Sequence, residues 1–169
     1  MKHYAYVTKR QAQPYREIFQ QIMFEVQKLV RDNFTFQFYF IGSSARNMIT
    51  YDSTTNIGFD FDINIEVNDS SKDYTPQEIR YILFNAIQTI SQSYGFNRVE
   101  NGKRVITIKK TNILLSSIEY GCDIAIVNNY IDDINLHQQE YISFNKKNNN
   151  YTWESQTSPF DIEDKISVG

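Results

Sequence analysis

The stretch Phe59-Asp60-Phe61-Asp62-Ile63-Asn64-Ile65-Glu66-Val67 alternates apolar and polar residues without a break. In a β-strand, this pattern places the apolar side chains on one face and the polar ones on the other. Asp and Asn are poor strand formers, so strand propensity alone does not explain their presence. Two carboxylates two residues apart on a rigid strand can bind one or two divalent cations, the usual partners of nucleotide phosphates. The alternative is that they form the solvated face of an edge strand.

The length and composition of the chain predict one soluble globular domain. It has 169 residues, of which 41% are hydrophobic and 22% charged. A net charge of −3 gives no overall attraction to nucleic acid or to anionic membranes. One cysteine excludes an internal disulfide and fits a reducing compartment. Because we find neither a membrane-length apolar run nor the apolar core of a signal peptide, we expect a cytoplasmic protein without membrane contact.

The hydrophobic periodicity predicts an α+β fold, with a mixed or mostly antiparallel sheet and helices mainly on one face. The expected elements are a helix over 14–32, a strand over 34–41, a short helix over 45–49, a loop over 50–58, the acidic strand, a capped helix from Thr75-Pro76 to Tyr94-Gly95, a hairpin over 96–111 around the turn pair Asn101-Gly102, a strand within 113–127 and a hairpin over 141–154.

Two other features accompany the acidic strand. Gly42-Ser43-Ser44 interrupts an apolar strand just before a short helix, where glycine permits close backbone approach and helix N–H groups bind phosphate. An ordinary turn is the alternative there. Arg46 could reach a phosphate or could be a solvent-exposed helix cation. Asp123 begins an apolar run, either as a solvent-side residue or as a third carboxylate brought beside Asp60 and Asp62 by strand pairing.

In this order, the motifs resemble those of the DNA polymerase beta-like nucleotidyltransferases. That superfamily combines an apolar residue followed by Gly-Ser or Gly-Gly, then Asp/Glu-x-Asp in an apolar strand, then a single acid in a later strand. The corresponding segments here are Ile41-Gly42-Ser43, Asp60-Phe61-Asp62 and Cys122-Asp123-Ile124. The resemblance spans about residues 14–127 and implies a short mixed sheet backed by helices.

The resemblance implies a metal-dependent enzyme that transfers a nucleoside monophosphate from an NTP, with ATP favoured, to a hydroxyl acceptor and releases pyrophosphate. Two Mg²⁺ ions, or Mn²⁺ in their place, would activate the acceptor oxygen and neutralise the leaving group. Carboxylates this close repel one another, so raised pKa values are expected without the ions. The implied site residues are Gly42, Ser43, Ser44 and Arg46 for the nucleotide, and Asp60, Asp62 and Asp123 for the metal ions and catalysis, with Asp123 helping to deprotonate the acceptor.

The chain departs from the superfamily pattern in two places. The spacing from Gly42 to Asp60 exceeds that of the smallest members and is closer to that of members that make cyclic dinucleotides or oligoadenylate. Many members also continue into a helical domain. We expect a single nucleotidyltransferase domain over 1–158, followed over 159–169 by a tail or by the start of such a helical segment. A protein partner could then complete the acceptor site.

Two other functions fit parts of the sequence. One is a non-catalytic nucleotide-binding or regulatory module, such as the antitoxin half of a two-protein system. The other is a glycosyltransferase that uses Asp-x-Asp, although it would need a large nucleotide-binding α/β domain. The acceptor stays open among nucleic acid, a nucleotide, a small molecule and a protein hydroxyl. The following residues make a basic hairpin that could steer nucleic acid or merely be solvated: Arg98, Lys103, Arg104, Lys109 and Lys110.

Overall fold

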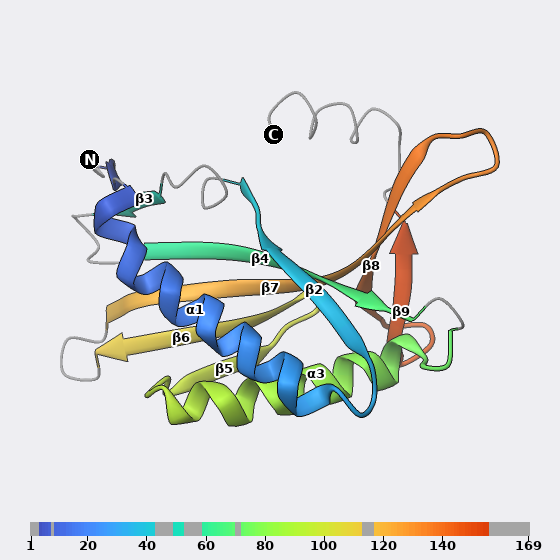
Figure 1. The fold of residues 1–169 in the computed structure, drawn as a ribbon, viewed down its shortest axis with the longest axis horizontal. Coiled ribbons are helices and arrows are strands. Elements are labelled where there is room, and N and C mark those ends of the chain that lie inside the picture. Colours follow the sequence, from blue (N-terminus) through green and yellow to red (C-terminus); the bar gives the residue numbers. More distant parts are fainter. Residues whose placement is uncertain are drawn as a thin grey trace.

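The computed structural model describes residues 4–7, 9–42, 49–52, 59–69, 72–112 and 117–155. Two helices and two β-sheets make up this part of the chain (Figure 1). The elements are β1 (Tyr4–Val7), α1 (Lys9–Val30), β2 (Thr35–Phe40), β3 (Ile49–Asp52), β4 (Phe59–Asn68), α3 (Pro76–Ser93), β5 (Arg98–Asn101), β6 (Val105–Asn112), β7 (Ser117–Ile131), β8 (His137–Asn145) and β9 (Asn150–Ser155).

The main sheet is mixed, and its strand order places the acidic strand near the centre. Five strands follow the order β2-β4-β7-β6-β5, and β8 continues from β7 to β9. The β4–β7 pair is parallel, while the other pairs of this sheet are antiparallel. The long strand β7 pairs with β6 along its first part and with β8 along residues 127–131. This architecture confirms the predicted α+β fold with a mixed sheet.

The hydrophobic core lies between this sheet and the two helices. On β4, Phe61, Ile63 and Ile65 are all buried, as the alternation predicts. They belong to one cluster with apolar side chains of α1, such as Ile22, and of α3, such as Leu83. The helices therefore cover one face of the sheet, and the alternate residues of the central strands point to the other face.

Helix α3 begins and ends as its sequence predicts. Thr75 and Glu78 form a capping box, in which the Thr75 hydroxyl accepts from the Glu78 N–H at 3.1 Å and Glu78 accepts from the Thr75 N–H at 2.9 Å. At the other end, Gly95 has a φ of +87° and lets the chain leave the helix. No helix in the described ranges is long and apolar enough to cross a membrane.

The first helix begins earlier than predicted. Helix α1 begins at Lys9, so Pro14 lies inside it rather than in its first turn. Proline removes one helical hydrogen bond, to the carbonyl of Arg10. The residues from Lys9 to Gln13 are nonetheless all good helix formers, which is enough to extend the helix by more than a turn.

Two further expectations change in the structure, and a third falls mostly outside the described residues. Residues 49–52 are not loop but form β3, which pairs with β1 in a separate two-stranded sheet. A four-residue strand of this kind depends on a distant partner, so local sequence does not reveal it. The hairpin over 96–111 is present, but Asn101 is the last residue of β5, and neither it nor Gly102 has a positive φ. The short helix expected over 45–49 lies outside the described residues except for Ile49, which is in β3.

Candidate active site

A row of polar side chains crosses the open face of the sheet, which is the face opposite the helices. Asp62 of β4 lies opposite Asp123 of β7 in the parallel pair. Asp123 in turn lies opposite Thr107 of β6, and Thr107 lies opposite Glu100 of β5. Since residues opposite one another share a face, the backbone register alone brings these four side chains together.

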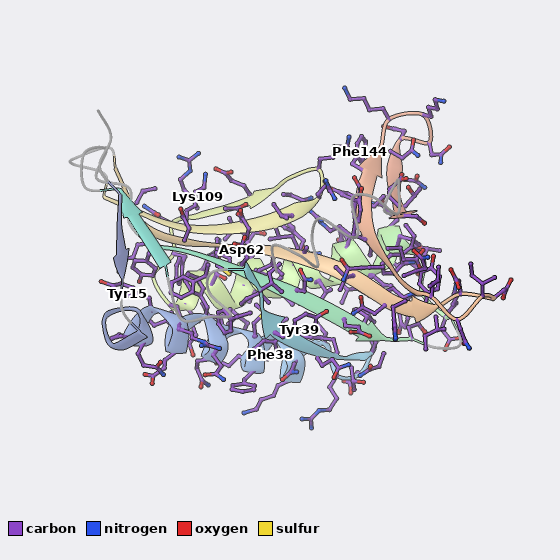
Figure 2. The ribbon with its side chains drawn as sticks, turned by 90° about the horizontal axis from the view of Figure 1, so that it is seen from above. Tyr15, Phe38, Tyr39, Asp62, Lys109 and Phe144 are labelled. Carbon is purple, nitrogen blue, oxygen red and sulfur yellow. The ribbon has the colours of Figure 1, made fainter. Side chains whose placement is uncertain are left out.

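A second row lies two residues away along the strands. It contains Asp60, Gly121, Lys109 and Arg98 on the same four strands. The β4, β7 and β6 members of both rows line a cavity of about 510 Å³, among them Asp60, Asp62, Asp123, Thr107 and Lys109. Figure 2 shows Asp62 and Lys109 on the side of the sheet away from α1. The carboxylates predicted from the sequence therefore line one cavity.

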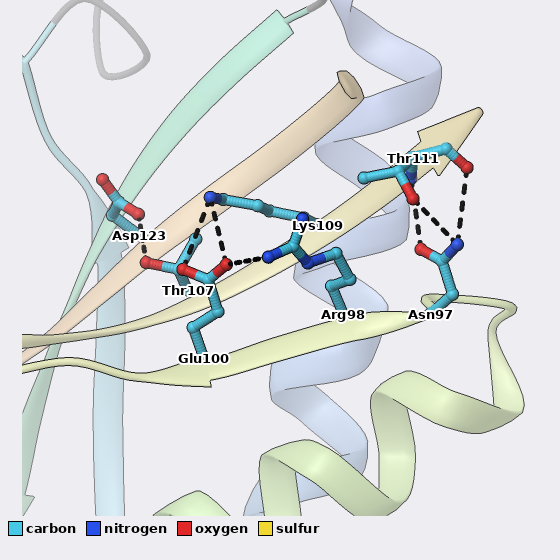
Figure 3. Close-up of polar contacts among 7 residues, drawn as sticks. All are labelled: Asn97, Arg98, Glu100, Thr107, Lys109, Thr111 and Asp123. Atoms are coloured by element: carbon cyan, nitrogen blue, oxygen red, sulfur yellow. Dashed lines mark hydrogen bonds and ion pairs between the residues drawn. The ribbon is translucent and has the colours of Figure 1, made fainter. Parts of the chain in front are cut away.

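Hydrogen bonds fix the β6 and β5 side of this cavity (Figure 3). The Thr107 hydroxyl donates to Asp123 Oδ1 at 2.7 Å. The Lys109 ammonium contacts both oxygens of Glu100 at 3.3 and 3.4 Å, and Arg98 Nη2 donates to Glu100 Oε1 at 3.0 Å. Glu100 thus binds two cations at once, and Thr107 holds one oxygen of Asp123.

The environment of the two β4 carboxylates disfavours their charged forms. Desolvation by burial raises the pKa of Asp62 above its ordinary value, and the charges of Asp123 and Asp60 raise it further. The pKa of Asp60 is also raised, first by desolvation and then by Asp123, while Lys109 opposes the shift. Raised pKa values were expected from mutual repulsion, but the larger cause is the loss of hydration at the sheet surface.

The carboxylates of the cavity are suitable ligands for a hard divalent cation. Carboxylate oxygens are the ligands that Mg²⁺ prefers, and a cation would relieve the unfavourable charge on Asp60 and Asp62. Among the residues that the structure describes, no group of three or more His, Cys, Asp or Glu side chains is close enough together to hold one metal ion.

The Gly-Ser motif is only partly described. Gly42 follows the end of β2 with a φ of +62°, a conformation that favours glycine. The neighbouring Ile41 N–H donates to the Asp62 carbonyl at 3.0 Å, which ties this motif to the acidic strand. Ser43, Ser44 and Arg46 lie outside the described residues, so their assignment to the nucleotide stays a prediction.

The other polar residues of β4 have structural surroundings. Asn64 is buried, with 8% of its surface exposed, rather than facing water. Glu66 is half-buried and accepts from Asn129 Nδ2 of β7 at 2.9 Å. Both residues therefore belong to the packing of the sheet beyond the cavity.

The structure adds Thr107 and Lys109 to the predicted site. The alternation in β6 indicates that these two residues share a face, but only the register of β6 on β7 places them beside Asp123. The basic hairpin, in contrast, does not form one surface. Lys109 lies on the open face, whereas Lys110 lies over the ring of Tyr120 on the helix face at 5.8 Å.

The remaining hairpin cations are also spread out. Arg104 lies over the ring of Tyr141 at 3.9 Å, and Lys103 is exposed in the turn. Arg98 is engaged with Glu100, as is Lys109. Most of the basic residues therefore do not converge on the site.

Comparison with solved structures identifies the fold. CdnG, a CD-NTase from Bradyrhizobium diazoefficiens solved in complex with GTP, superimposes with a TM-score of 0.61 at 17% sequence identity over 90% of this chain. This chain spans 40% of the length of that protein. CD-NTases belong to the polymerase beta-like nucleotidyltransferase superfamily. The chain therefore has the fold that its motifs indicate.

Other similar structures give lower scores. The Elizabethkingia meningoseptica CdnE cyclic dinucleotide synthase, solved with GTP and Apcpp, has a TM-score of 0.45 at 12% identity and covers 82% of this chain and 47% of its own. The Vibrio cholerae DncV cyclic AMP-GMP synthase has a TM-score of 0.48 at 15% identity, covering 79% of this chain and 33% of its own. No family model and no curated protein matches the chain by sequence.

Proposed function

We propose that this chain is a nucleotidyltransferase domain that transfers a nucleoside monophosphate from an NTP, with ATP favoured, to a hydroxyl acceptor and releases pyrophosphate. The observation that carries the proposal is that Asp60, Asp62 and Asp123 line one cavity on the open face of the sheet. The fold shared with CdnG, which was solved in complex with GTP, supports an NTP as the substrate.

In this proposal, Asp60 and Asp62 would hold two Mg²⁺ ions, and Asp123 would help to hold one of them. When bound, Mg²⁺ supplies charge that makes the acceptor hydroxyl more acidic and neutralises the leaving pyrophosphate. The acceptor oxygen forms a bond to the α-phosphorus, while the bond from that phosphorus to the bridging oxygen of the β-phosphate breaks. Asp123 helps to take up the proton of the acceptor hydroxyl.

Thr107 and Gly42 have supporting parts in this reaction. Thr107 donates to one oxygen of Asp123, which fixes the carboxylate and leaves its other oxygen for the ion or the acceptor. Gly42, at the end of β2, is on the opposite side of β4 from β7, so the triphosphate and the acceptor approach the carboxylates from opposite sides.

The test is release of pyrophosphate from each NTP in the presence of Mg²⁺ and a panel of hydroxyl acceptors. Asp62→Asn and Asp123→Asn should each lower the rate by about a thousandfold, because each removes a charge that the transition state requires. Asp133→Asn, in the exposed turn between β7 and β8, is the matched control and should retain the wild-type rate. Full activity in both site variants, with unchanged circular dichroism spectra, would overturn the proposal.

A non-catalytic nucleotide-binding module is the second candidate. The fold shared with CdnG, which was solved in complex with GTP, supports nucleotide binding without requiring turnover. For such a module, NTPs would raise the melting temperature of the protein, yet no pyrophosphate would form with any acceptor. Loss of this NTP-induced stabilisation in Asp62→Asn would indicate that the same cavity binds the nucleotide.

A further inference from the structure

We infer that the acceptor carries an anionic group beside its reacting hydroxyl, and that Lys109 binds this group. The inference rests on the proposed function and adds a specificity-determining residue to it. It follows from the shape of the cavity, the absence of a side chain at Gly121, and the way in which two cations share Glu100.

Among the described residues, the cavity extends from the carboxylates toward β6. Beyond Asp60 and Asp62 it is lined by β7 and by Val105, Thr107 and Lys109 of β6. Among the described residues, β2 contributes none of the lining. Because Gly42 follows β2, the open space lies on the side away from the predicted triphosphate site. A molecule in this space would present its hydroxyl at Asp123 and extend toward Lys109.

Gly121 opens the route between Asp60 and Lys109. It occupies the middle of their row, and any other residue there would place a side chain between them. A Cβ atom on Gly121 would also lie 3.0 Å from the carbonyl oxygen of Ile108, so even alanine would be tight. The glycine therefore keeps a path open along the sheet surface. This path is about 10 Å long from Asp60 to Lys109, which is two strand spacings.

The far end of this path is locally positive, while the three carboxylates of the candidate site lie toward its other end. Lys109 and Arg98 both contact Glu100, so one carboxylate neutralises only one of the two cations. The Lys109 side chain is 25% exposed, and Figure 3 shows it lying along the sheet toward Glu100 and Thr107. If Lys109 turns to a ligand, Arg98 still satisfies Glu100, so the exchange leaves no carboxylate unpaired.

These features favour a small anionic acceptor over two alternatives. A neutral acceptor would leave the local positive charge at Lys109 unused, and a long polyanion would require the other hairpin cations to continue the path. Lys110 points to the helix face, and Arg104 lies over Tyr141. The charge at the site therefore suits one phosphate or carboxylate on a compact hydroxyl compound.

The experiment compares acceptors that differ only in the anionic group. AMP is paired with adenosine and glycerol 3-phosphate with glycerol, while glycerate, also compared with glycerol, provides a carboxylate in place of phosphate. Pyrophosphate release is measured for the wild type, Lys109→Met, Lys109→Arg and Lys110→Met, which is the matched control on the opposite face of the same strand. Binding of AMP is measured separately by titration calorimetry, which needs no turnover.

Lys109→Met should raise KM for the anionic acceptors by about tenfold to a hundredfold, the worth of a charge-assisted hydrogen bond. The neutral acceptors should be affected less than twofold, Lys109→Arg should recover part of the loss, and Lys110→Met should behave as wild type. Equal losses for both members of each pair would overturn the inference and leave the proposed function intact. Weaker AMP binding in Lys109→Met without any pyrophosphate release would support the Lys109 subsite and contradict the proposed function.

Discussion

The two faces of β7 differ sharply in burial, although successive residues of the strand alternate between them. Cys122 and Ile124 point to the helices and are 1% exposed or less, while Asp123 between them is exposed on the open face. The same contrast holds on β4, where Phe61 is buried and its neighbours Asp60 and Asp62 line the cavity. The β4–β7 pair therefore contributes one face to the hydrophobic core and the other face to the candidate site.

This difference separates what stabilises the fold from what the site requires. The helix face contributes through apolar burial, which is worth about 25 cal/mol for each Å² removed from water. The open face is poorer in such contacts and keeps carboxylates whose pKa values desolvation raises. We therefore expect substitutions on the helix face to lower stability and substitutions on the open face to alter activity.

The largest stability effect should come from Ile124→Ala. Ile124 is fully buried at the centre of the sheet, so the variant loses apolar contact and leaves a cavity. We expect a loss of about 3 kcal/mol in the free energy of unfolding, measured by urea denaturation. The adjacent Asp123→Ala faces solvent and should change this free energy by less than about 1 kcal/mol. Equal losses in the two variants would contradict the division between the faces.

The second-largest stability effect should come from replacing the buried arginine Arg80, with the exposed Arg98 as the comparison. Arg80 of α3 is 1% exposed and lies over the ring of Tyr151. Its Nε donates to Asn101 Oδ1 at 3.0 Å, and its Nη2 donates to the carbonyls of Gly102 and Val105 at 2.7 and 3.1 Å. Arg80 therefore joins α3 to the β5–β6 turn.

Arg80→Met should lower the free energy of unfolding by about 2 kcal/mol, because these buried acceptors lose a charged donor. Arg98→Met is the matched control, since the Arg98 side chain is 57% exposed on the open face. It should change the free energy by about 0.5 kcal/mol or less. The comparison is made by urea denaturation at one ionic strength. A smaller loss for Arg80→Met than for Arg98→Met would contradict the role of Arg80 in joining α3 to the β5–β6 turn.

The sequence predicts the parts of this molecule that depend on local pattern. Strict alternation is enough to identify β4 and its two faces, and Thr75, Glu78 and Gly95 mark the ends of α3 through local hydrogen bonds and backbone conformation. The sequence does not predict register. That Asp62 lies opposite Asp123, and Asp123 opposite Thr107, depends on how segments about 16 to 60 residues apart slide along one another.

For the same reason, the sequence does not predict which charged side chains form pairs. Alternation in β6 places Lys109 and Lys110 on opposite faces, but only the strand register puts Lys109 beside Glu100 and Lys110 over Tyr120. Strand β3 and the burial of Asn64 likewise depend on distant partners. Motif order indicated the superfamily fold without any of this information, because each motif needs only its own strand and the turn beside it.

The smallest predicted effect on stability comes from the charge of Asp62 on the open face. In the metal-free protein, Asp62 has a raised pKa, so its ionisation opposes folding. This penalty is present at pH values above the raised pKa. It vanishes as the pH falls below 3.8, the ordinary value for the unfolded chain, because the carboxyl is then protonated in both states.

Asp62→Asn should therefore raise the melting temperature of the metal-free protein at pH 7 by about 2 °C, and the gain over wild type should shrink steadily toward pH 4. Thermal melts in a chelating buffer measure this, with Asp133→Asn as the control that shows no such trend. Adding Mg²⁺ should reverse the order at pH 7, since the wild type keeps the carboxylate that binds the ion. A gain that is independent of pH would mean that the introduced amide packs better than the carboxylate of Asp62, and that the charge on the open face does not oppose folding.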